Sequence, residues 1–208
     1  MDDSNTLRGL SLYVLARHPL AFRFIEKLLA GTACAVKPYT EPNGPAVEED
    51  RWILIVDTYS VKDWPVIASQ SRLNGARTII LIDQLPSSDE EVRLVYVGVH
   101  GIVLFENAEH ELAKAVGLVS SGGLWISRNA LAQYANRAAG GTLSSKSNRF
   151  TGREQQILFF LERGFSNKEI GNSLKISERT VKFHVSNVLQ KLNVDSRRHV
   201  PGVAFTNN

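Results

Sequence analysis

Apolar positions recur at helical spacing along the segment from Thr151 to Arg197. An apolar residue every three or four positions gives a helix one buried face, so three such stripes predict three amphipathic helices packed around a small core. The stripe residues are Ile157, Leu158 and Leu161 in the first helix, Ile170 and Leu174 in the second with Ile176 after it, and Val181, Val185, Val188, Leu189 and Leu192 in the third.

Residues at the expected helix ends support these three helices. At each helix start, a side chain can cap the first backbone N–H groups, and in the first two helices a glutamate three residues later can bond back to the cap residue. The residues at the helix ends tolerate a left-handed backbone conformation. These residues are Thr151 with Glu154, Ser166 with Glu169, and Ser177 at the starts, and Gly164 and Asn193 at the stops. Only Lys175-Ile176-Ser177 separates the last two helices, and so short a turn predicts a steep, helix-turn-helix crossing. Gly171 costs about 1 kcal/mol against alanine inside a helix, so we expect a close backbone approach there.

A different pattern precedes this segment, because short, largely apolar runs alternate with helix-like stretches. The runs at 11–15, 52–56, 78–82 and 101–105, with a shorter one at 33–36, are typical of buried parallel strands. The helical candidates are 20–30, 61–73, 88–97 and 109–119, whereas 41–50 is expected to be a loop. Such alternation predicts an α/β fold, a doubly wound parallel five-stranded sheet.

Two domains are therefore expected in the 208 residues: an α/β domain over 1–121 and a small all-α domain over 149–208. The connection, 122–148, is expected to hold a helix at about 128–138 and a flexible linker at 140–148. The acidic start has no signal pattern and no apolar run is long enough to span a membrane, which favours a cytoplasmic protein. The single cysteine, Cys34, argues against a disulfide framework or a cysteine-based metal cluster.

The charge balance points to the C-terminal part. Lys and Arg number 24 and Asp and Glu 21, but residues 150–200 carry nine basic and five acidic side chains. The outer face of the third helix mixes cations, base-edge hydrogen-bonding groups and one aromatic ring: Arg179, Lys182, Phe183, Ser186, Asn187 and Gln190. Such a face is typical of a helix that reads DNA. Because the excess charge is modest, we expect dimers that bind two half-sites.

The segment also carries T-x-R-E, G-x-S-N-K-E-I, I-S-x-x-T-V-K-x-H and K-L-x-V-x-S-R in register, and so resembles the LuxR-type DNA-binding domain of NarL/FixJ response regulators. The resemblance implies that Lys182, Phe183 and Ser186 look into the major groove, where Phe183 would contact a thymine methyl. We expect His184 to be packed or phosphate-bonded rather than catalytic. The full set of expected DNA contacts is Lys168, Ser177, Arg179, Thr180, Lys182, Phe183, Ser186, Asn187 and Lys191.

The α/β part resembles the receiver domain of the same family, through ARHPLAFRFIEKLL and GVHGIVLFENAEHELAKAV. That family phosphorylates an aspartate beside a Mg²⁺ held by carboxylates. Asp57 matches the phosphoacceptor position, but Ala16 and Arg17 replace the two metal-binding acids, Phe105 replaces the lysine, and no Ser or Thr closes the fourth strand. Mg²⁺ needs several oxygen ligands, so we expect no metal cofactor. Our hypothesis is that Arg17 pairs with Asp57 in place of the metal.

These patterns favour a sequence-specific transcription regulator that binds double-stranded DNA without aspartate phosphorylation. Alternatives are a phosphorylation-controlled regulator that uses Asp57, a partner-binding adaptor with weak DNA affinity, and a sigma-factor-like segment. No nucleophile–base set or phosphate loop suggests an enzyme. A homodimer is expected, and RNA polymerase or a regulatory protein is a further candidate partner. Pro201 should cut the family's fourth helix to about one turn, so Phe22 and Tyr96 are candidates for a dimer surface on the receiver-like domain.

Overall fold

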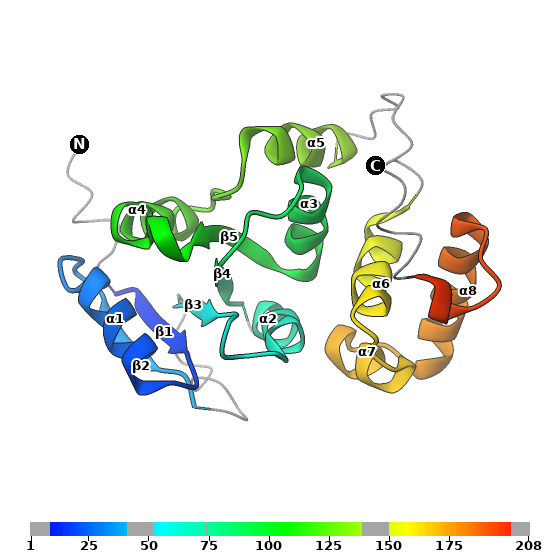
Figure 1. Ribbon diagram of the computed structural model, residues 1–208, viewed down its shortest axis with the longest axis horizontal. Coiled ribbons are helices and arrows are strands. Elements are labelled where there is room, and N and C mark those ends of the chain that lie inside the picture. The colour runs from blue at the N-terminus through cyan, green and yellow to red at the C-terminus, as the bar shows by residue number, and fades with distance from the viewer. Residues whose placement is uncertain (1–8, 41–51, 74, 139–149, 201–208) are drawn as a thin grey trace.

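The computed structural model describes residues 9–40, 52–73, 75–138 and 150–200, which form two domains (Figure 1). The loop expected at 41–50, the linker expected at 140–148 and the helix break expected at Pro201 lie outside the described residues. Within the described part, no helix has the length and apolarity needed to cross a bilayer.

The N-terminal domain is built on a parallel sheet with strand order β2-β1-β3-β4-β5, which confirms the predicted doubly wound fold. The strands are β1 (Ser11–Leu15), β2 (Ala35–Pro38), β3 (Trp52–Asp57), β4 (Arg77–Ile82) and β5 (Val99–Leu104). Every residue of β3 is buried, as its position in the middle of the sheet requires. The carboxyl ends of β1, β3, β4 and β5 therefore meet at one edge.

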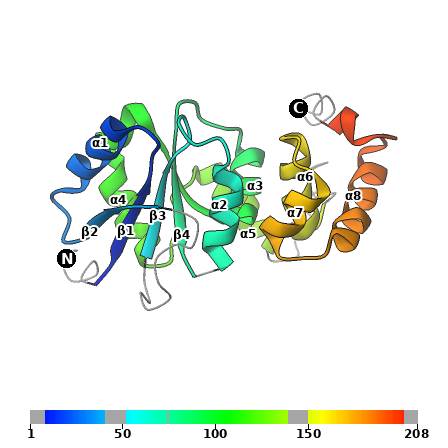
Figure 2. The same cartoon turned by 90° about the horizontal axis from the view of Figure 1, so that it is seen from below.

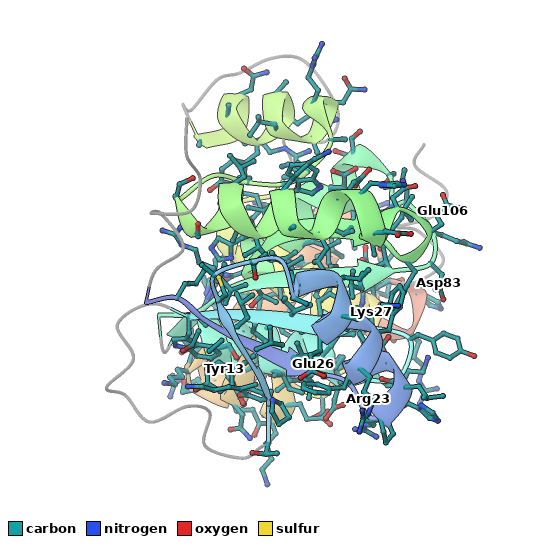
Figure 3. All side chains as sticks on the ribbon, turned by 90° about the vertical axis from the view of Figure 1, so that its left-hand side faces the viewer. Tyr13, Arg23, Glu26, Lys27, Asp83 and Glu106 are labelled. Atoms are coloured by element: carbon teal, nitrogen blue, oxygen red, sulfur yellow. The ribbon has the colours of Figure 1, made fainter. Side chains whose placement is uncertain are left out.

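Helices cover both faces of the sheet, α1 and α4 on one side and α2 and α3 on the other (Figure 2). Their bounds are α1 (Pro19–Leu29), α2 (Trp64–Leu73), α3 (Ser88–Val97) and α4 (Ala108–Ser120), with the 3-10 turn η2 (Phe105–Asn107) before α4. Side chains of β3 alternate between the two cores: Ile53 and Ile55 join α1 and α4, and Leu54 and Val56 join α2 and α3. The outer side of α1 carries the charged residues Arg23, Glu26 and Lys27 (Figure 3).

The predicted connecting helix is α5 (Arg128–Ala138), and it packs along α3. Tyr134 lies against Tyr96 with ring centroids 5.7 Å apart, and Arg137 pairs with Asp89 of α3 at 2.6 Å. These contacts fix α5 to the α/β domain.

The C-terminal domain contains α6 (Gly152–Glu162), α7 (Asn167–Leu174), α8 (Glu178–Leu192) and the 3-10 turn η4 (Arg197–His199). Both predicted reciprocal caps are present, since Thr151 and Glu154 exchange hydrogen bonds, as do Ser166 and Glu169. Asn193 has the expected positive φ of 58°. Gly164, φ 78°, and Lys175, φ 49°, are also left-handed, and Lys175 ends α7.

The close approach expected at Gly171 is to the turn between α7 and α8. A Cβ at this position would lie 2.9 Å from the carbonyl oxygen of Ile176 and 3.7 Å from the amide nitrogen of Glu178. The glycine thus lets the turn fold tightly onto α7, which sets the crossing of the two helices.

The two domains are packed together, α3 against α6 and α2 against α7. The Gln156 side chain donates a 2.6 Å hydrogen bond to the carbonyl of Tyr96, and Trp64 meets Phe159 edge to face with ring centroids 6.1 Å apart. Figures 1 and 2 both place α6 and α7 between the α/β domain and α8. The α/β domain therefore packs on the side of the helical domain away from α8.

Charged side chains border this domain contact. Arg163 pairs with Glu90 at 3.2 Å and stacks on the ring of Phe159 at 3.7 Å, while Arg93 lies 3.8 Å from Glu162. Burial raises the pKa of Glu162, and the attraction of Arg93 and Arg163 offsets this only in part. The α3–α6 contact thus contains a desolvated carboxylate held by two arginines.

The expectation that Tyr96 and Phe22 are exposed for dimer contact is wrong. Tyr96 lies under Tyr134 and next to Gly152, and Phe22 packs against the core shared by α1 and α4. The exposed apolar side chains of α1 are Leu20 and Phe24, at 70% and 43%. The helical stripe of α1 turns Phe22 inward because it lies three residues before the buried Ile25.

Candidate nucleic-acid interface

Helix α8 presents one polar face away from the rest of the molecule. Val181, Val185 and Val188 are buried on its inner side. The outer side carries exposed residues at helical spacing, and these are Arg179, Lys182, Phe183, Ser186 and Gln190. Phe183 is 62% exposed, so its ring is available for an apolar contact. The face combines cations, hydrogen-bonding groups and one apolar ring.

Cations lie near the starts of α7 and α8. Lys168 lies in the first turn of α7 and Arg179 in the first turn of α8, and neither makes an ion pair within the described part of the chain. Lys182 lies 3.5 Å from Glu178, one turn earlier, but both side chains are more than half exposed, so this pairing is weak. Helix N-termini with such cations attract phosphate groups.

Two expected contacts lie on the flank of α8 and are partly buried. Thr180 shares a 2.8 Å hydrogen bond with Ser177, whose hydroxyl also accepts from the Thr180 amide to cap the helix. Asn187 is partly buried on the same helix. Half-buried His184 meets Phe183 edge to face at 5.5 Å, which fits the expected packed histidine. Ser177 and Thr180 thus have a structural role in starting the helix.

Lys191 is placed differently from the other expected contacts. Its ammonium lies 2.6 Å from the Glu154 carboxylate, whose side chain is 6% exposed. Burial acts to raise the pKa of Glu154, but hydrogen bonds from Lys191 and Thr151 outweigh it and the pKa lies below its ordinary value. Lys191 therefore joins α8 to the cap of α6, and the structure gives it a structural role.

Two further arginines tie segments of the helical domain together, and they were not expected from the sequence. Arg197 donates to the Asn167 side chain at 3.2 Å and to the carbonyl of Phe165, and so ties η4 to the turn before α7. Arg153 donates to the carbonyl of Leu174 at 3.4 Å. Both occur in motifs of the family resemblance, so that resemblance was the one signal that marked them.

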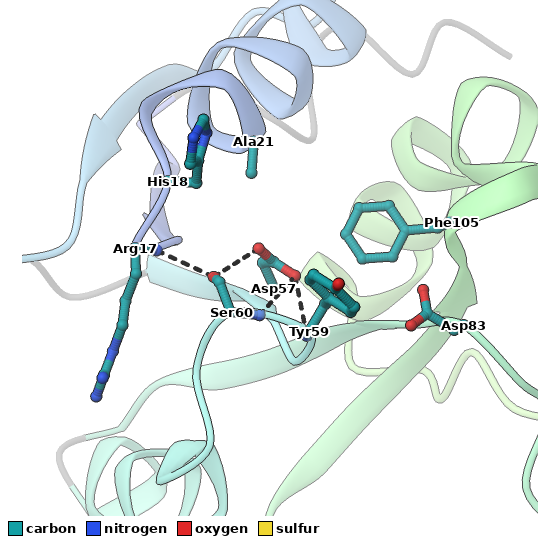
Figure 4. Close-up of a pocket in the computed structure, with 8 residues that line it drawn as sticks. All are labelled: Arg17, His18, Ala21, Asp57, Tyr59, Ser60, Asp83 and Phe105. Carbon is teal, nitrogen blue, oxygen red and sulfur yellow. Dashed lines mark hydrogen bonds between the residues drawn. The ribbon is translucent and has the colours of Figure 1, made fainter.

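The carboxyl edge of the sheet forms a second site around Asp57, which is 2% exposed. Its Oδ1 accepts from the amides of Tyr59 and Ser60, at 3.0 and 3.4 Å, and its Oδ2 accepts from the Ser60 hydroxyl at 2.6 Å (Figure 4). All three partners are donors, so both oxygens of Asp57 act as acceptors.

The hypothesis that Arg17 pairs with Asp57 is wrong. The Arg17 guanidinium lies 2.9 Å from Asp63 and points away from Asp57 (Figure 4). Only the Arg17 amide approaches, by donating a 3.1 Å hydrogen bond to Ser60. Because the adjacent loop already supplies three donors to Asp57, the arginine is free to pair with an exposed acid instead.

The residues at this edge do not fit a Mg²⁺ ion. Ala16 offers no ligand, the Arg17 head is turned away, and Phe105 covers the place where the resemblance expects a lysine. Within the described residues, no group of three or more histidines, cysteines or acids could hold a metal ion. Around Asp57 there is instead an open pocket of about 590 Å³, lined by Arg17, His18, Ala21, Asp57, Tyr59, Ser60, Asp83 and Phe105.

Comparison with known proteins agrees with this geometry. Residues 148–204 match the family described as bacterial regulatory proteins, luxR family. The chain is 27% identical to the transcriptional regulatory protein DegU of Brevibacillus brevis, over 95% of this chain and 93% of that protein. It is 30% identical to the response regulator protein VraR of Staphylococcus aureus, over 62% of this chain and 61% of VraR.

A solved structure shares the fold. RcsB from Salmonella enterica serovar Typhimurium, bound to promoter rprA in the presence of phosphomimetic BeF3⁻, aligns with a TM-score of 0.55 at 17% identity. The alignment covers 94% of this chain and 98% of RcsB. The fold of both domains therefore has a counterpart in this solved structure.

Proposed function

This chain is a DNA-binding response regulator with a LuxR-type helix-turn-helix domain behind a receiver-like domain, and from this premise we propose that it reads a specific DNA sequence without aspartate phosphorylation. The observation that carries the proposal is the position of α8. Its outer face is turned away from the receiver-like domain, with α6 and α7 between them (Figure 2). A helix that is already accessible needs no switch to uncover it.

The Asp57 site supports the second half of the proposal. Phosphoryl transfer to an aspartate requires charge neutralisation by a metal and by nearby cations. In this chain Ala16 stands in place of a metal-binding acid and Phe105 in place of the lysine. The Arg17 guanidinium pairs with Asp63. Asp57 instead has a structural use, since it accepts from Ser60 and from two loop amides. No Mg²⁺ or other cofactor is therefore proposed.

We place α8 in the major groove of double-stranded DNA. Phe183 and Ser186 then face base edges, where the ring meets thymine methyl groups and the hydroxyl forms a hydrogen bond. Lys168, Arg179 and Lys182 contact phosphates, which sets the orientation of the helix and makes the affinity salt-dependent. The face that discriminates between sequences is small, so a single domain has modest specificity.

A homodimer on two half-sites follows from that small face, because two copies double the number of base pairs that are read. DNA as the partner implies a cytoplasmic site of action. Among similar proteins, RcsB is described in complex with promoter DNA in the presence of a phosphomimetic. For the present chain we propose binding without such a group.

Selection of bound sites from random DNA tests the proposal, with the full-length protein and no phosphodonor. We expect enrichment of one motif, with two half-sites if the protein binds as a dimer. Lys182→Ala should weaken binding to the selected site and reduce its salt dependence by about one phosphate contact. Lys114→Ala removes an exposed lysine of α4 and serves as the matched control. Failure to enrich any motif, or equal effects of the two variants, would count against DNA reading by α8.

A further inference from the structure

We propose that the pocket around Asp57 binds a small organic cation, an amine with an apolar aromatic or aliphatic body. The pocket, about 590 Å³ in volume, lies at the carboxyl edge of the sheet. Its volume is within the range of about 300–1,000 Å³ typical of small-molecule sites, and this edge is where open α/β sheets bind ligands. The inference concerns a site in the receiver-like domain and stands apart from DNA reading by α8.

The walls of the pocket suit an apolar body. In Figure 4, Phe105 and Asp83 lie on one side of Asp57 and Tyr59, and His18 and Ala21 lie on the other. Tyr59 is 71% exposed, so much of its ring is open to a ligand. Two aromatic side chains and an alanine methyl thus line the pocket. A magnesium site would have acidic side chains and water molecules in their place.

The charges in the pocket select a cation. Asp57 has three donors on its two oxygens, which leaves one of about four acceptor positions, on Oδ2, for a further donor. Asp83 is exposed, and no described residue forms a hydrogen bond or ion pair with it. The negative Glu106 follows β5 at the same edge (Figure 3). An anion would be repelled here, and a neutral ligand would desolvate these carboxylates without compensation.

No positively charged side chain among the residues that line the pocket points at the carboxylates of Asp57 and Asp83. The Arg17 head is held by Asp63 at 2.9 Å and points out of the pocket (Figure 4). Lys62 lies 5.8 Å from the centre of the Tyr59 ring and is not part of the lining. His18 uses its Nδ1 to accept from the Leu20 amide and so cap α1. An ammonium could therefore bind the carboxylates while the Tyr59 and Phe105 rings stabilise it.

Three naphthalene probes of equal size test the inference by calorimetric titration of the full-length protein. These are 1-naphthylmethylamine, 1-naphthalenemethanol and 1-naphthoate, which carry positive, neutral and negative groups. We expect the amine to bind at least about tenfold more tightly than the other two. Equal binding of all three, preference for naphthoate, or no binding of the amine would overturn the proposal.

Variants locate the binding. Asp83→Asn removes an exposed charge and should weaken amine binding about tenfold, and Phe105→Lys, which adds a cation beside Asp57, should abolish it. Asp195→Asn makes the same charge change in the helical domain and should leave binding unchanged. Circular dichroism of each variant verifies its fold. Amine binding that survives both Asp83→Asn and Phe105→Lys would place it elsewhere and refute the assignment, whatever the result of the DNA experiments.

Discussion

Replacing Lys191 by methionine removes its charge but keeps most of its apolar stem, and so isolates its pairing with Glu154. The Glu154 side chain is 6% exposed and Lys191 35%, with a 2.6 Å separation. A hydrogen bond to a charged group contributes about 1.5–3 kcal/mol, and the partial exposure of Lys191 reduces this, so we expect a loss of about 1–2 kcal/mol in the free energy of unfolding. Glu154 keeps its bond from the Thr151 amide at 2.7 Å, which limits the loss.

Chemical denaturation followed by circular dichroism measures this loss, and a double-mutant cycle with Glu154→Gln assigns it to the pair. Glutamine keeps the cap acceptor, so Lys191→Met should cost about 1 kcal/mol less in that background. A lowered pKa in the folded state means that the stabilisation is present above the ordinary value of 4.5 and is lost as the pH falls through the lowered value. The effect of Lys191→Met should therefore be full at neutral pH and shrink below pH 4.5.

The opposite result would refute this role for Lys191. If the lysine is a phosphate contact, Lys191→Met will leave the free energy of unfolding unchanged, weaken binding to all DNA sequences alike, and lower the salt slope by about one. With the structural role, correctly folded Lys191→Met keeps the salt slope of the unaltered protein.

The other parts of the structure give further expectations. Gly171→Ala should gain about 1 kcal/mol of helix propensity but lose about 1–3 kcal/mol because its Cβ would lie 2.9 Å from the Ile176 carbonyl oxygen. We therefore expect chemical denaturation to show a net loss of about 0–2 kcal/mol in the free energy of unfolding, and a clear stabilisation would contradict the tight turn. Arg163→Ala removes the Glu90 pair and the Phe159 stack, so it should speed hydrogen exchange in α3 and α6 while affinity for DNA stays unchanged. Weaker DNA binding by this variant would mean that the domain contact supports α8.

Features encoded by local sequence could be predicted. The helix starts at Thr151, Ser166 and Ser177 depend on side chains that cap a backbone three residues away, and the structure contains all three. The buried strands β3 and β4 follow from runs that are apolar on both faces. The exposed face of α8 could be predicted because assigning the valines to the buried face leaves the polar residues on the opposite side.

Partners of long exposed side chains could not be predicted in this way. Arg17 and Asp57 are neighbours at the sheet edge, but Asp57 is satisfied by Tyr59 and Ser60, two and three residues further on. An aspartate at the start of a turn often accepts a hydrogen bond from the backbone amide two residues further on, and this local signal would have favoured the observed geometry. Asp63, in the loop before α2, then pairs with the arginine.

The contact between the domains was missed because it is formed by residues far apart in the sequence. One signal was present: positions 157–161 are apolar without interruption, and all five side chains are buried. A helix that is apolar on all sides must pack on more than one neighbour. Phe159 supplies the second surface, against Trp64.

The most direct test of phosphorylation-independent DNA reading is the affinity of the full-length protein for its selected site, with and without Mg²⁺ and a small phosphodonor. Intact mass measured on the same samples reports any phosphoryl group. We predict equal affinity in both conditions, equal affinity of Asp57→Asn, and no gain of a phosphoryl group. Binding that requires the phosphodonor, accompanied by a phosphoryl group that Asp57→Asn lacks, would contradict the account.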